Sequence, residues 1–285
     1  MTILDELAAY AGIRVERAKE NVPLEVVKEQ ALACADMQKN CQPGTAGSPD
    51  QAAMTAVTDR PEWFAFEKAL AGPGIGFICE VKKASPSKGL IAAEFPYVEI
   101  AKEYEAAGAE CISVLTEPKW FLGSGTYLKK ITESVRTPCI RKDFTIDEYM
   151  IYEAKLLGAG AVLLICSLLD TKQLEAYIRI ADRLGLSALV EAHDAEEIRS
   201  AVASGARMIG VNNRNLKDFT VDVRNSQNLR KLVPDNILFV AESGIRNADD
   251  VRAMREAGAD AVLVGETLMR ARDKTQMLHL LRGTN

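Results

Sequence analysis

Charged side chains at the end of an apolar segment are the first feature of this chain that could do chemistry. Residues 77–81 have the composition of a buried strand, and they carry a carboxylate and an ammonium two residues apart, at Glu80 and Lys82. Successive strand side chains point to opposite faces, so Ile78, Glu80 and Lys82 share one face. Burying an ion is costly unless it is paired, so this face predicts a polar pocket. An edge strand with one solvated face is the alternative.

Polar and charged residues also end several later apolar segments. If these segments are parallel strands of one barrel, their carboxyl ends meet at one mouth, where the catalytic groups of such barrels lie. The spacing then predicts a ring of acid and base groups around a substrate. The members of this ring are Glu80, Lys82, Lys142, Asp143, Glu191, Asn212, Arg214, Glu242 and Ser243.

Three short segments suit a phosphate group. Ser85 lies in a loop of small and polar residues, Ser243 and Gly244 follow a strand, and Gly265 precedes a helix. Unpaired backbone N–H groups converge in such loops and at helix N-termini, and glycine lets the backbone approach the oxygens closely. We expect Glu266 to point outward, because a carboxylate beside a phosphate dianion is unfavourable.

A repeated pattern predicts the architecture that positions these groups. A small or apolar residue, a glycine and an alanine precede an apolar run four times, with glycines at Gly108, Gly158, Gly205 and Gly258. Each glycine is typical of a helix C-cap. The glycines are 50, 47 and 53 residues apart, which fits two βα units per repeat.

Eight strand-and-helix units predict a parallel (β/α)8 barrel for residues 71–285, with a doubly wound open sheet as the structural rival. Amphipathic stretches between the strands are predicted to be helices, at 97–107, 148–157, 171–184, 196–203 and 248–257. The predicted strands are 77–81, 111–115, 138–140, 161–165, 187–190, 208–211, 238–241 and 261–264.

Residues 1–70 precede the barrel and are predicted to form a helical extension packed on it, in one domain of 285 residues. Thr2 and Asp5 resemble a capping box for a helix that ends before Pro23, and a second helix covers 24–37. The first helix carries an apolar stripe at Leu4, Leu7, Ala8, Ala11, Val15 and Ala18. Residues 38–59 have the composition of a loop. A further helix begins at Pro61 and carries Trp63, Phe64, Phe66 and Leu70. These helices either plug the bottom of the barrel or cover its mouth.

Composition and charge narrow the class of protein. With 48% hydrophobic and 26% charged residues and a net charge of −5, the chain has no basic footprint for nucleic acid. Its apolar runs are too short to span a membrane, and its N-terminus lacks the features of a signal peptide, so a cytoplasmic protein is expected. The sequence leaves the oligomeric state open, a monomer included.

Cysteine and histidine usage gives no indication of a metal or cofactor. The six cysteines include no C-x-x-C pair and are expected to be reduced, mostly buried residues. Only two histidines occur, which excludes a multi-histidine metal site. His279 lies in an apolar helix pattern and is interpreted as structural, while His193 either lines a site or hydrogen-bonds a loop. No Walker A loop or G-x-G-x-x-G fingerprint is present.

In their order along the chain, these motifs resemble the indole-3-glycerol phosphate synthase family. The resemblance covers 80–87, Leu115 to Glu117, Lys142 to Phe144, Glu191, residues 212–214 and 242–245, and Gly265. It implies ring closure of 1-(2-carboxyphenylamino)-1-deoxyribulose 5-phosphate with loss of carbon dioxide and water, a lyase step of tryptophan biosynthesis.

The resemblance also assigns roles. It implies Lys142 as the acid, assisted by Lys82, with Glu80 and Glu191 moving protons. The nearness of two lysines predicts a lowered pKa for each. The remaining implied contacts are Asn212, Arg214 and Glu242 for the substrate, Leu115 and Phe121 for its aromatic ring, and Ser85, Ser243, Gly244 and Gly265 for its phosphate.

Other functions remain open on the residues alone. A phosphoribosyl isomerase shares the barrel, but such enzymes typically use a carboxylate or cysteine pair where this chain has lysine and glutamate. A non-catalytic phosphate-binding barrel needs no acid and base groups around an apolar slot. A Schiff-base aldolase is a third alternative, because lysines end two strands.

Overall fold

The predicted apolar segments form one closed sheet of parallel strands in the computed structural model, which describes residues 2–40, 62–215 and 219–284. Neighbouring strands follow the order β1-β10-β9-β8-β7-β6-β5-β4, and β4 pairs with β1 to close the barrel. The (β/α)8 barrel is thereby confirmed. The strands are β1 (Gly76–Val81), β4 (Cys111–Leu115), β5 (Cys139–Lys142), β6 (Ala161–Ile165), β7 (Ser187–Ala192), β8 (Met208–Asn212), β9 (Leu238–Glu242) and β10 (Ala261–Val264).

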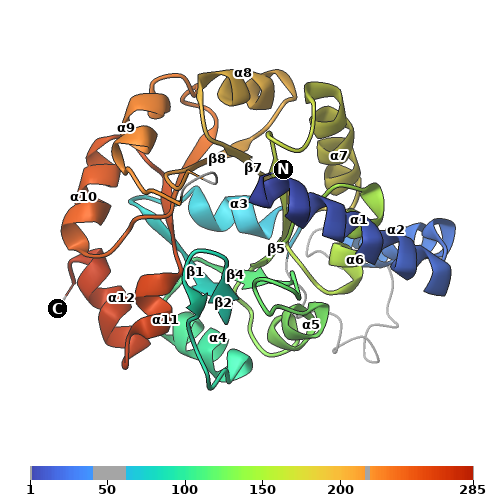
Figure 1. Ribbon diagram of the computed structural model, residues 1–285, viewed down its shortest axis with the longest axis horizontal. Coiled ribbons are helices and arrows are strands. Elements are labelled where there is room, and N and C mark those ends of the chain that lie inside the picture. Colours follow the sequence, from blue (N-terminus) through green and yellow to red (C-terminus); the bar gives the residue numbers. More distant parts are fainter. Residues whose placement is uncertain (1, 41–61, 216–218, 285) are drawn as a thin grey trace.

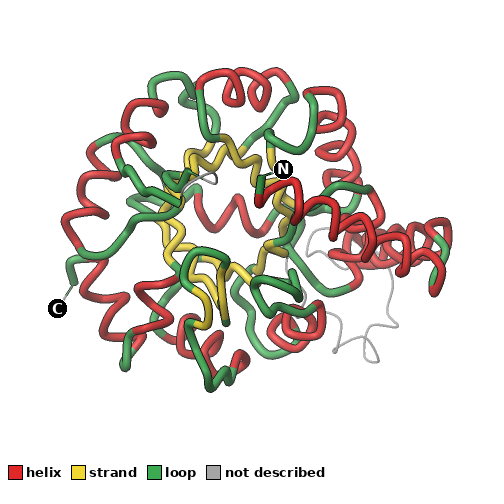
Figure 2. The backbone as a smooth tube through the Cα atoms, viewed as in Figure 1, coloured by secondary structure: helices red, strands yellow, loops and turns green. Residues whose placement is uncertain are grey.

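Helices surround this ring of strands (Figures 1 and 2). The four repeat glycines all follow helices in the left-handed region, with φ between 80° and 86°, as their C-cap pattern predicts. The outer helices are α4 (Tyr97–Ala106), α5 (Gly125–Thr132), α6 (Glu148–Leu156), α7 (Thr171–Arg183), α8 (Ala195–Ala203), α9 (Arg224–Arg230), α10 (Ala248–Glu256), α11 (Glu266–Arg270) and α12 (Lys274–Arg282).

The short helix α3 (Ala65–Leu70) lies inside the ring of strands and closes one end of the barrel (Figure 2). Its buried Phe66 and Leu70 pack in one cluster with inward-facing strand residues such as Ile78 and Ile140. The predicted helix start at Pro61 is wrong for the described part, because Phe64 adopts a left-handed conformation with φ 57°. Pro61 itself lies outside the described residues.

The first two helices lie outside the ring of strands and both contact α6, and the first turns of α1 reach over the mouth of the barrel, one of the two predicted positions (Figure 1). Helix α1 (Ile3–Asn21) begins with the predicted capping box between Thr2 and Asp5, and its buried residues follow the predicted apolar stripe. Helix α2 (Leu24–Asn40) packs on α6 and continues to Asn40, so the predicted loop at 38–59 begins later than expected. The rest of that loop lies outside the described residues.

A small hairpin that the sequence did not predict follows β1. Strands β2 (Ala84–Ser85) and β3 (Gly89–Leu90) pair in antiparallel fashion, with Ser85 opposite Gly89. Gly89 adopts φ 62°, which glycine tolerates without strain. The hairpin therefore fixes the loop that carries Ser85 at the mouth of the barrel.

The cysteines agree in part with the prediction. Cys79, Cys111 and Cys139 are buried, and burial raises the pKa of the Cys139 thiol to about 12. Cys34 and Cys166 are only partly buried, and Cys41 lies outside the described residues. Among the described helices, none has the length and apolar composition needed to cross a membrane.

Candidate active site

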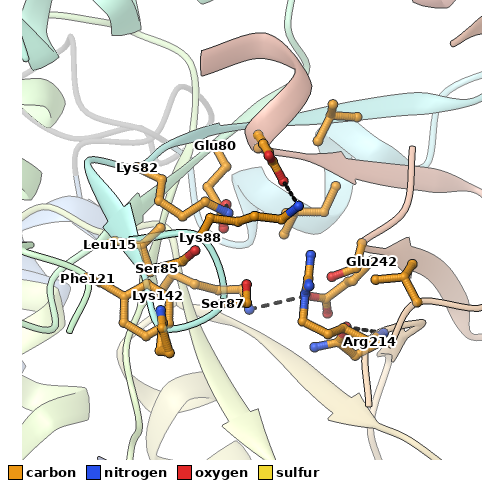
Figure 3. Close-up of a pocket in the computed structure, with 18 of the residues that line it drawn as sticks. Glu80, Lys82, Ser85, Ser87, Lys88, Leu115, Phe121, Lys142, Arg214 and Glu242 are labelled. Atoms are coloured by element: carbon orange, nitrogen blue, oxygen red, sulfur yellow. Dashed lines mark hydrogen bonds and ion pairs between the residues drawn. The ribbon is translucent and has the colours of Figure 1, made fainter. Parts of the chain in front are cut away.

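A cavity of about 600 Å³ opens at the carboxyl ends of the strands. The sequence had placed its candidate residues on seven separate loops or strand ends, and the closed barrel brings all of them to this one cavity. In Figure 3, Leu115 and Phe121 lie at one side, and Arg214 and Glu242 lie at the other. The predicted residues that line it are Glu80, Lys82, Ser85, Leu115, Phe121, Lys142, Glu191, Asn212, Arg214, Glu242, Ser243, Gly244 and Gly265.

Lys142, at the end of β5, is surrounded by carboxylates. Its Nζ lies 3.1 Å from Oε2 of Glu191 and 3.2 Å from Oε2 of Glu242, and only 13% of its side chain is exposed. Burial alone would lower the pKa of Lys142, but the charges of Glu191, Glu242 and Glu80 outweigh burial and raise it. The predicted lowering of this pKa is therefore wrong, because acidic neighbours, rather than a second lysine, dominate the site.

The two carboxylates beside Lys142 differ in their surroundings. Glu191 accepts hydrogen bonds from Lys142 and from Nδ2 of Asn212 at 3.2 Å, and these groups together with His193 outweigh burial and lower its pKa. Oε1 of Glu242 is buried without a hydrogen-bond partner among the described residues. Burial, with the charges of Glu191 and Glu80, raises the pKa of Glu242 to about 7 despite the attraction of Lys142. One carboxylate thus holds its charge, and the other is suited to hold a proton.

Glu80 and Lys82 form an ion pair at the end of β1, as their shared strand face predicts. The space beside this pair exists because residue 265 is a glycine. A Cβ at Gly265 would lie 2.2 Å from Oε2 of Glu80 and 2.7 Å from Nζ of Lys82, both far inside contact distance. Gly265 therefore positions the ion pair, a role that the sequence did not reveal because the three residues meet only across the β1–β10 pairing.

Small residues line the cavity where the loop after β9 was predicted to contact a phosphate. Ser243 and Gly244 adopt φ of 67° and 91°, so two successive left-handed residues form a sharp turn after β9. Asn213 holds this turn by donating from Nδ2 to the carbonyl oxygen of Ser243 at 3.1 Å. Ser243 and Gly244 line the same cavity as Ser85.

Glu266 does not point away from this region, contrary to the sequence prediction. It lines the cavity and pairs with Lys88 at 3.6 Å and with Arg270 at 3.0 Å. Burial would raise the pKa of its carboxyl, but the hydrogen bond from Arg270 and the charge of Lys88 lower it. Two cations thus offset the carboxylate that would otherwise repel a phosphate. Figure 3 shows Lys88 reaching along this wall.

The apolar side of the cavity is larger than the sequence predicted. Phe121 and Phe144 place their ring centroids 6.0 Å apart, next to Leu115. Ile3 and Leu7 of α1 complete this wall, and the sequence reasoning missed both. Leu7 was visible only as one position of an apolar helical stripe, a pattern that is more often a packing surface.

Asp143 has a structural position behind Lys142. Its carboxylate is bound by both terminal nitrogens of Arg14, at 2.7 and 3.1 Å, and by the hydroxyl of Thr116 at 2.6 Å. Burial raises the pKa of this carboxyl, but Arg14 and Arg141 outweigh burial and lower it. The charge of Asp143 is thus already satisfied by α1 and the barrel, although the residue touches the cavity.

Asn212 and Arg214 occupy the wall after β8. Oδ1 of Asn212 accepts a hydrogen bond from the backbone N–H of Arg214 at 3.0 Å, and the Arg214 guanidinium donates to the carbonyl oxygen of Phe219 at 3.2 Å. Gly210, earlier in β8, leaves room for Glu242, since a Cβ there would lie 2.1 Å from Oε1 of Glu242. Sequence reasoning missed Gly210, because a strand glycine alone does not reveal what lies opposite it.

Comparison with known proteins identifies a single family. Residues 6–281 match the family model described as indole-3-glycerol phosphate synthase. An indole-3-glycerol phosphate synthase of Ruminiclostridium cellulolyticum is 55% identical over 99% of both chains, and one of Lacticaseibacillus paracasei is 48% identical over 97% of both. The solved 3-hexulose-6-phosphate synthase from Salmonella typhimurium matches with a TM-score of 0.61, 15% identity and coverage of 73% of this chain and 97% of that one, a likeness in fold alone.

Proposed function

Because this chain belongs to the indole-3-glycerol phosphate synthase family, we propose that the cavity at its barrel mouth closes the indole ring with Lys142 as the general acid. The activity is that of a carboxy-lyase of tryptophan biosynthesis. The reaction converts 1-(2-carboxyphenylamino)-1-deoxyribulose 5-phosphate to indole-3-glycerol phosphate, carbon dioxide and water. The proposed roles rest on one observation: the ammonium of Lys142 lies at the barrel mouth between the carboxylates of Glu191 and Glu242.

Ring closure begins when the ring carbon that bears the carboxylate attacks the ketone. Negative charge develops on the ketone oxygen, so a protonated group must lie beside it. Lys142 is such a group, since the charge of Glu191, with that of Glu242 whenever Glu242 is ionised, keeps it protonated, and the two ion pairs hold its ammonium at the mouth. Lys142 donates its proton to this oxygen.

Loss of carbon dioxide restores the aromatic ring. Lys82 binds the substrate carboxylate beforehand, and its pairing with Glu80 holds the ammonium beside the reacting carbons. The aromatic ring lies against Leu115, Phe121 and Phe144, an apolar wall on which the carboxylate loses part of its hydration.

Loss of water completes the reaction. A base removes the proton from the carbon next to the ring nitrogen while the hydroxyl leaves as water. Glu191 acts as that base, because it is ionised and has Lys142 and Asn212 to hold its carboxylate in place. Asn212 and Arg214 orient the glycerol chain, with Glu242 as a further contact, and Ser85, Ser243, Gly244 and Gly265 hold the phosphate.

A substitution of the acid tests these roles. Lys142→Ala should lower kcat by at least about 100-fold, the usual contribution of a positioned acid, while substrate binding remains measurable. Fluorescence of the indole product, formed from the synthetic substrate, reports turnover, and Lys39→Ala on α2 is a matched control outside the cavity. Retention of most of the turnover in Lys142→Ala would overturn the assignment.

The Schiff-base alternative has its own test. Ring closure by general acid catalysis forms no covalent adduct with the enzyme, so borohydride should not trap substrate on Lys82 or Lys142. A stable adduct detected by mass spectrometry would favour the aldolase reading instead.

A further inference from the structure

A histidine lies directly behind the base Glu191 and outside the cavity lining. Nε2 of His193 is 3.5 Å from Oε1 of Glu191, and this buried nitrogen has no hydrogen-bond partner among the described residues. Nδ1 of the same ring is 3.1 Å from Oε2 of Glu197. The imidazole therefore bridges two carboxylates, one in the catalytic ring and one on α8.

The second carboxylate leads to the surface. Glu197 lies in the first turn of α8, where its Oε2 also accepts the backbone N–H of His193 at 2.7 Å. Its Oε1 accepts a hydrogen bond from the hydroxyl of Ser167, which is exposed. The side chains of Glu197 and His193 are 19% and 18% exposed, whereas that of Glu191 is 3% exposed. Solvent thus reaches this pair, and neither residue lines the cavity.

The reaction needs protons from solvent. Protonation of the ketone oxygen uses one proton, departure of the hydroxyl as water uses a second, and removal of the carbon-bound proton returns one. Each turnover of the ionised substrate therefore takes up one proton in total. A substrate that fills the mouth would block direct exchange of protons between solvent and the buried carboxylate of Glu191.

We propose that His193 is a positioning residue that passes protons between solvent, through Glu197, and the catalytic Glu191. This inference rests on the proposed function, since it acts through the base assigned there. The hydrogen bond to Glu197 fixes the tautomer of the neutral ring, with Nδ1–H donating and Nε2 free to accept. The protonated ring carries a proton on each nitrogen, and transfer of the Nε2 proton to Glu191 leaves the neutral ring with Nδ1–H. A turn of the ring about its Cβ–Cγ bond then brings the bare Nε2 to the Glu197 side, where it takes up a proton, and the reverse turn restores the starting state.

The charges around His193 suit this exchange. Burial lowers the pKa of the imidazole, but the hydrogen bond to Glu197 and the charges of Glu191, Glu197 and Glu242 outweigh burial and raise it. Glu191, Glu197 and Glu242 belong to β7, α8 and β9. Protonated His193 in turn lowers the pKa of both Glu191 and Glu197. The imidazole therefore keeps its proton to a higher pH than a free histidine, as a group that supplies protons to Glu191 requires.

The pH profile of turnover tests the relay. His193→Gln should lower kcat by about tenfold, with KM changed less than about twofold, and should remove the decline of kcat that follows deprotonation of His193 as pH rises. Glu197→Gln keeps the imidazole but removes its carboxylate, so the same decline should move to lower pH. The exposed His279 on α12, the other histidine of the chain, provides the matched control His279→Gln, which should behave as wild type.

A merely structural role for His193 predicts other results. A His193→Gln variant with the wild-type pH profile would overturn the relay, as would a change in KM alone. Thermal unfolding of each variant shows whether a loss of kcat reflects a loss of folded protein, and Glu197→Gln gives an independent answer if His193→Gln folds poorly.

A titration without substrate separates this inference from the proposed function. Nuclear magnetic resonance of the ring nitrogens follows the two histidines, and His279→Gln assigns their signals. Glu191→Gln should lower the pKa of His193, and an unchanged pKa would overturn the coupling. If the wild-type protein makes no indole product, the proposed function fails while this coupling can still be observed.

Discussion

The acidic residues around Lys142 differ from one another at the scale of single atoms. Glu191 has several donors, whereas Oε1 of Glu242 is buried without one. Two carboxylates with opposed pKa shifts are a common arrangement in acid and base catalysis, because one can keep a proton while the other stays ionised. This difference has consequences for stability as well as for chemistry.

The protonation of Glu242 predicts how stability depends on pH. Its pKa rises from 4.5 to about 7 on folding, so the folded state holds the proton more tightly than the unfolded state. The stabilisation is full below pH 4.5 and is lost as pH rises through about 7, with a total on the order of 3 kcal/mol. Glu242→Gln should lose this dependence in urea unfolding measured at pH 4.5 and pH 7.5. The same change in the free energy of unfolding between the two pH values in wild type and variant would contradict the prediction.

The close contact of Gly265 with the Glu80–Lys82 pair predicts that adding one methyl group there strongly lowers turnover. In Gly265→Ala, the added methyl group displaces the Glu80–Lys82 pair, so kcat/KM should fall at least about tenfold, as small misplacements of reacting groups do. Gly12→Ala is the matched control, because nothing lies within 4 Å of a Cβ there and alanine favours its helix. Steady-state kinetics of both variants give the comparison, and unchanged kinetics in Gly265→Ala would mean that the pair does not need this space.

At the scale of elements, helix α1 joins the site from outside the barrel. Its first turns supply Ile3 and Leu7 to the cavity lining, and two turns further on, Arg14 binds Asp143 beside Lys142. Lys19 binds Asp147, the N-cap residue of α6, at 2.8 Å. The same helix thus contacts both the substrate cavity and the residue next to the proposed acid.

The link between Arg14 and Asp143 predicts that α1 affects stability and turnover together. Arg14→Met leaves a buried carboxylate without its main partner, so unfolding should become about 2–3 kcal/mol easier. Asp143 is adjacent to Lys142, so kcat/KM should also fall about tenfold. Arg17→Met, at an exposed position of the same helix, is the control. Urea unfolding and kinetics that match wild type in Arg14→Met would show that α1 does not hold the site.

At the scale of the whole molecule, the two ends of the barrel have different tasks. Helix α3 fills the end opposite the cavity with Phe66 and Leu70, whose neighbours are apolar. The mouth instead holds the charged residues around Lys142, and Glu80, Glu191 and Glu242 among them are buried in the barrel. We propose that residues 1–70 and the barrel at 71–285 form a single domain, because α3 fills one end of the barrel while α1 lines the cavity at the other.

The packing of α3 inside the barrel predicts that a single substitution in this helix causes a large loss of stability. Leu70→Ala should lower the free energy of unfolding by about 2–5 kcal/mol, because the side chain is buried inside the barrel and leaves a cavity. Leu280→Ala, at a position that is 49% exposed, should change it by less than about 0.5 kcal/mol. Thermal or urea unfolding compares the two. Similar small changes would contradict a packed plug.

The sequence by itself determined the barrel, its strands and the residues that line its mouth. The glycines at helix ends, the apolar runs between them and the polar residues that finish each run are local patterns, so they survive without knowledge of the fold. The strands agreed closely. Strands β5 and β7 run on by two residues, to Lys142 and Ala192, and β8 and β9 by one, while β1 begins one residue earlier and β5 one residue later than predicted.

Only the tertiary structure decided how those residues affect one another. Closure of the barrel sets Glu191 and Glu242 around Lys142, and so raises a pKa that the sequence predicted to fall. It also brings Arg14 to Asp143, 129 residues away, and places Gly265 against Glu80. Charge and steric effects act through space over a few ångströms, whereas a sequence pattern records only neighbours along the chain.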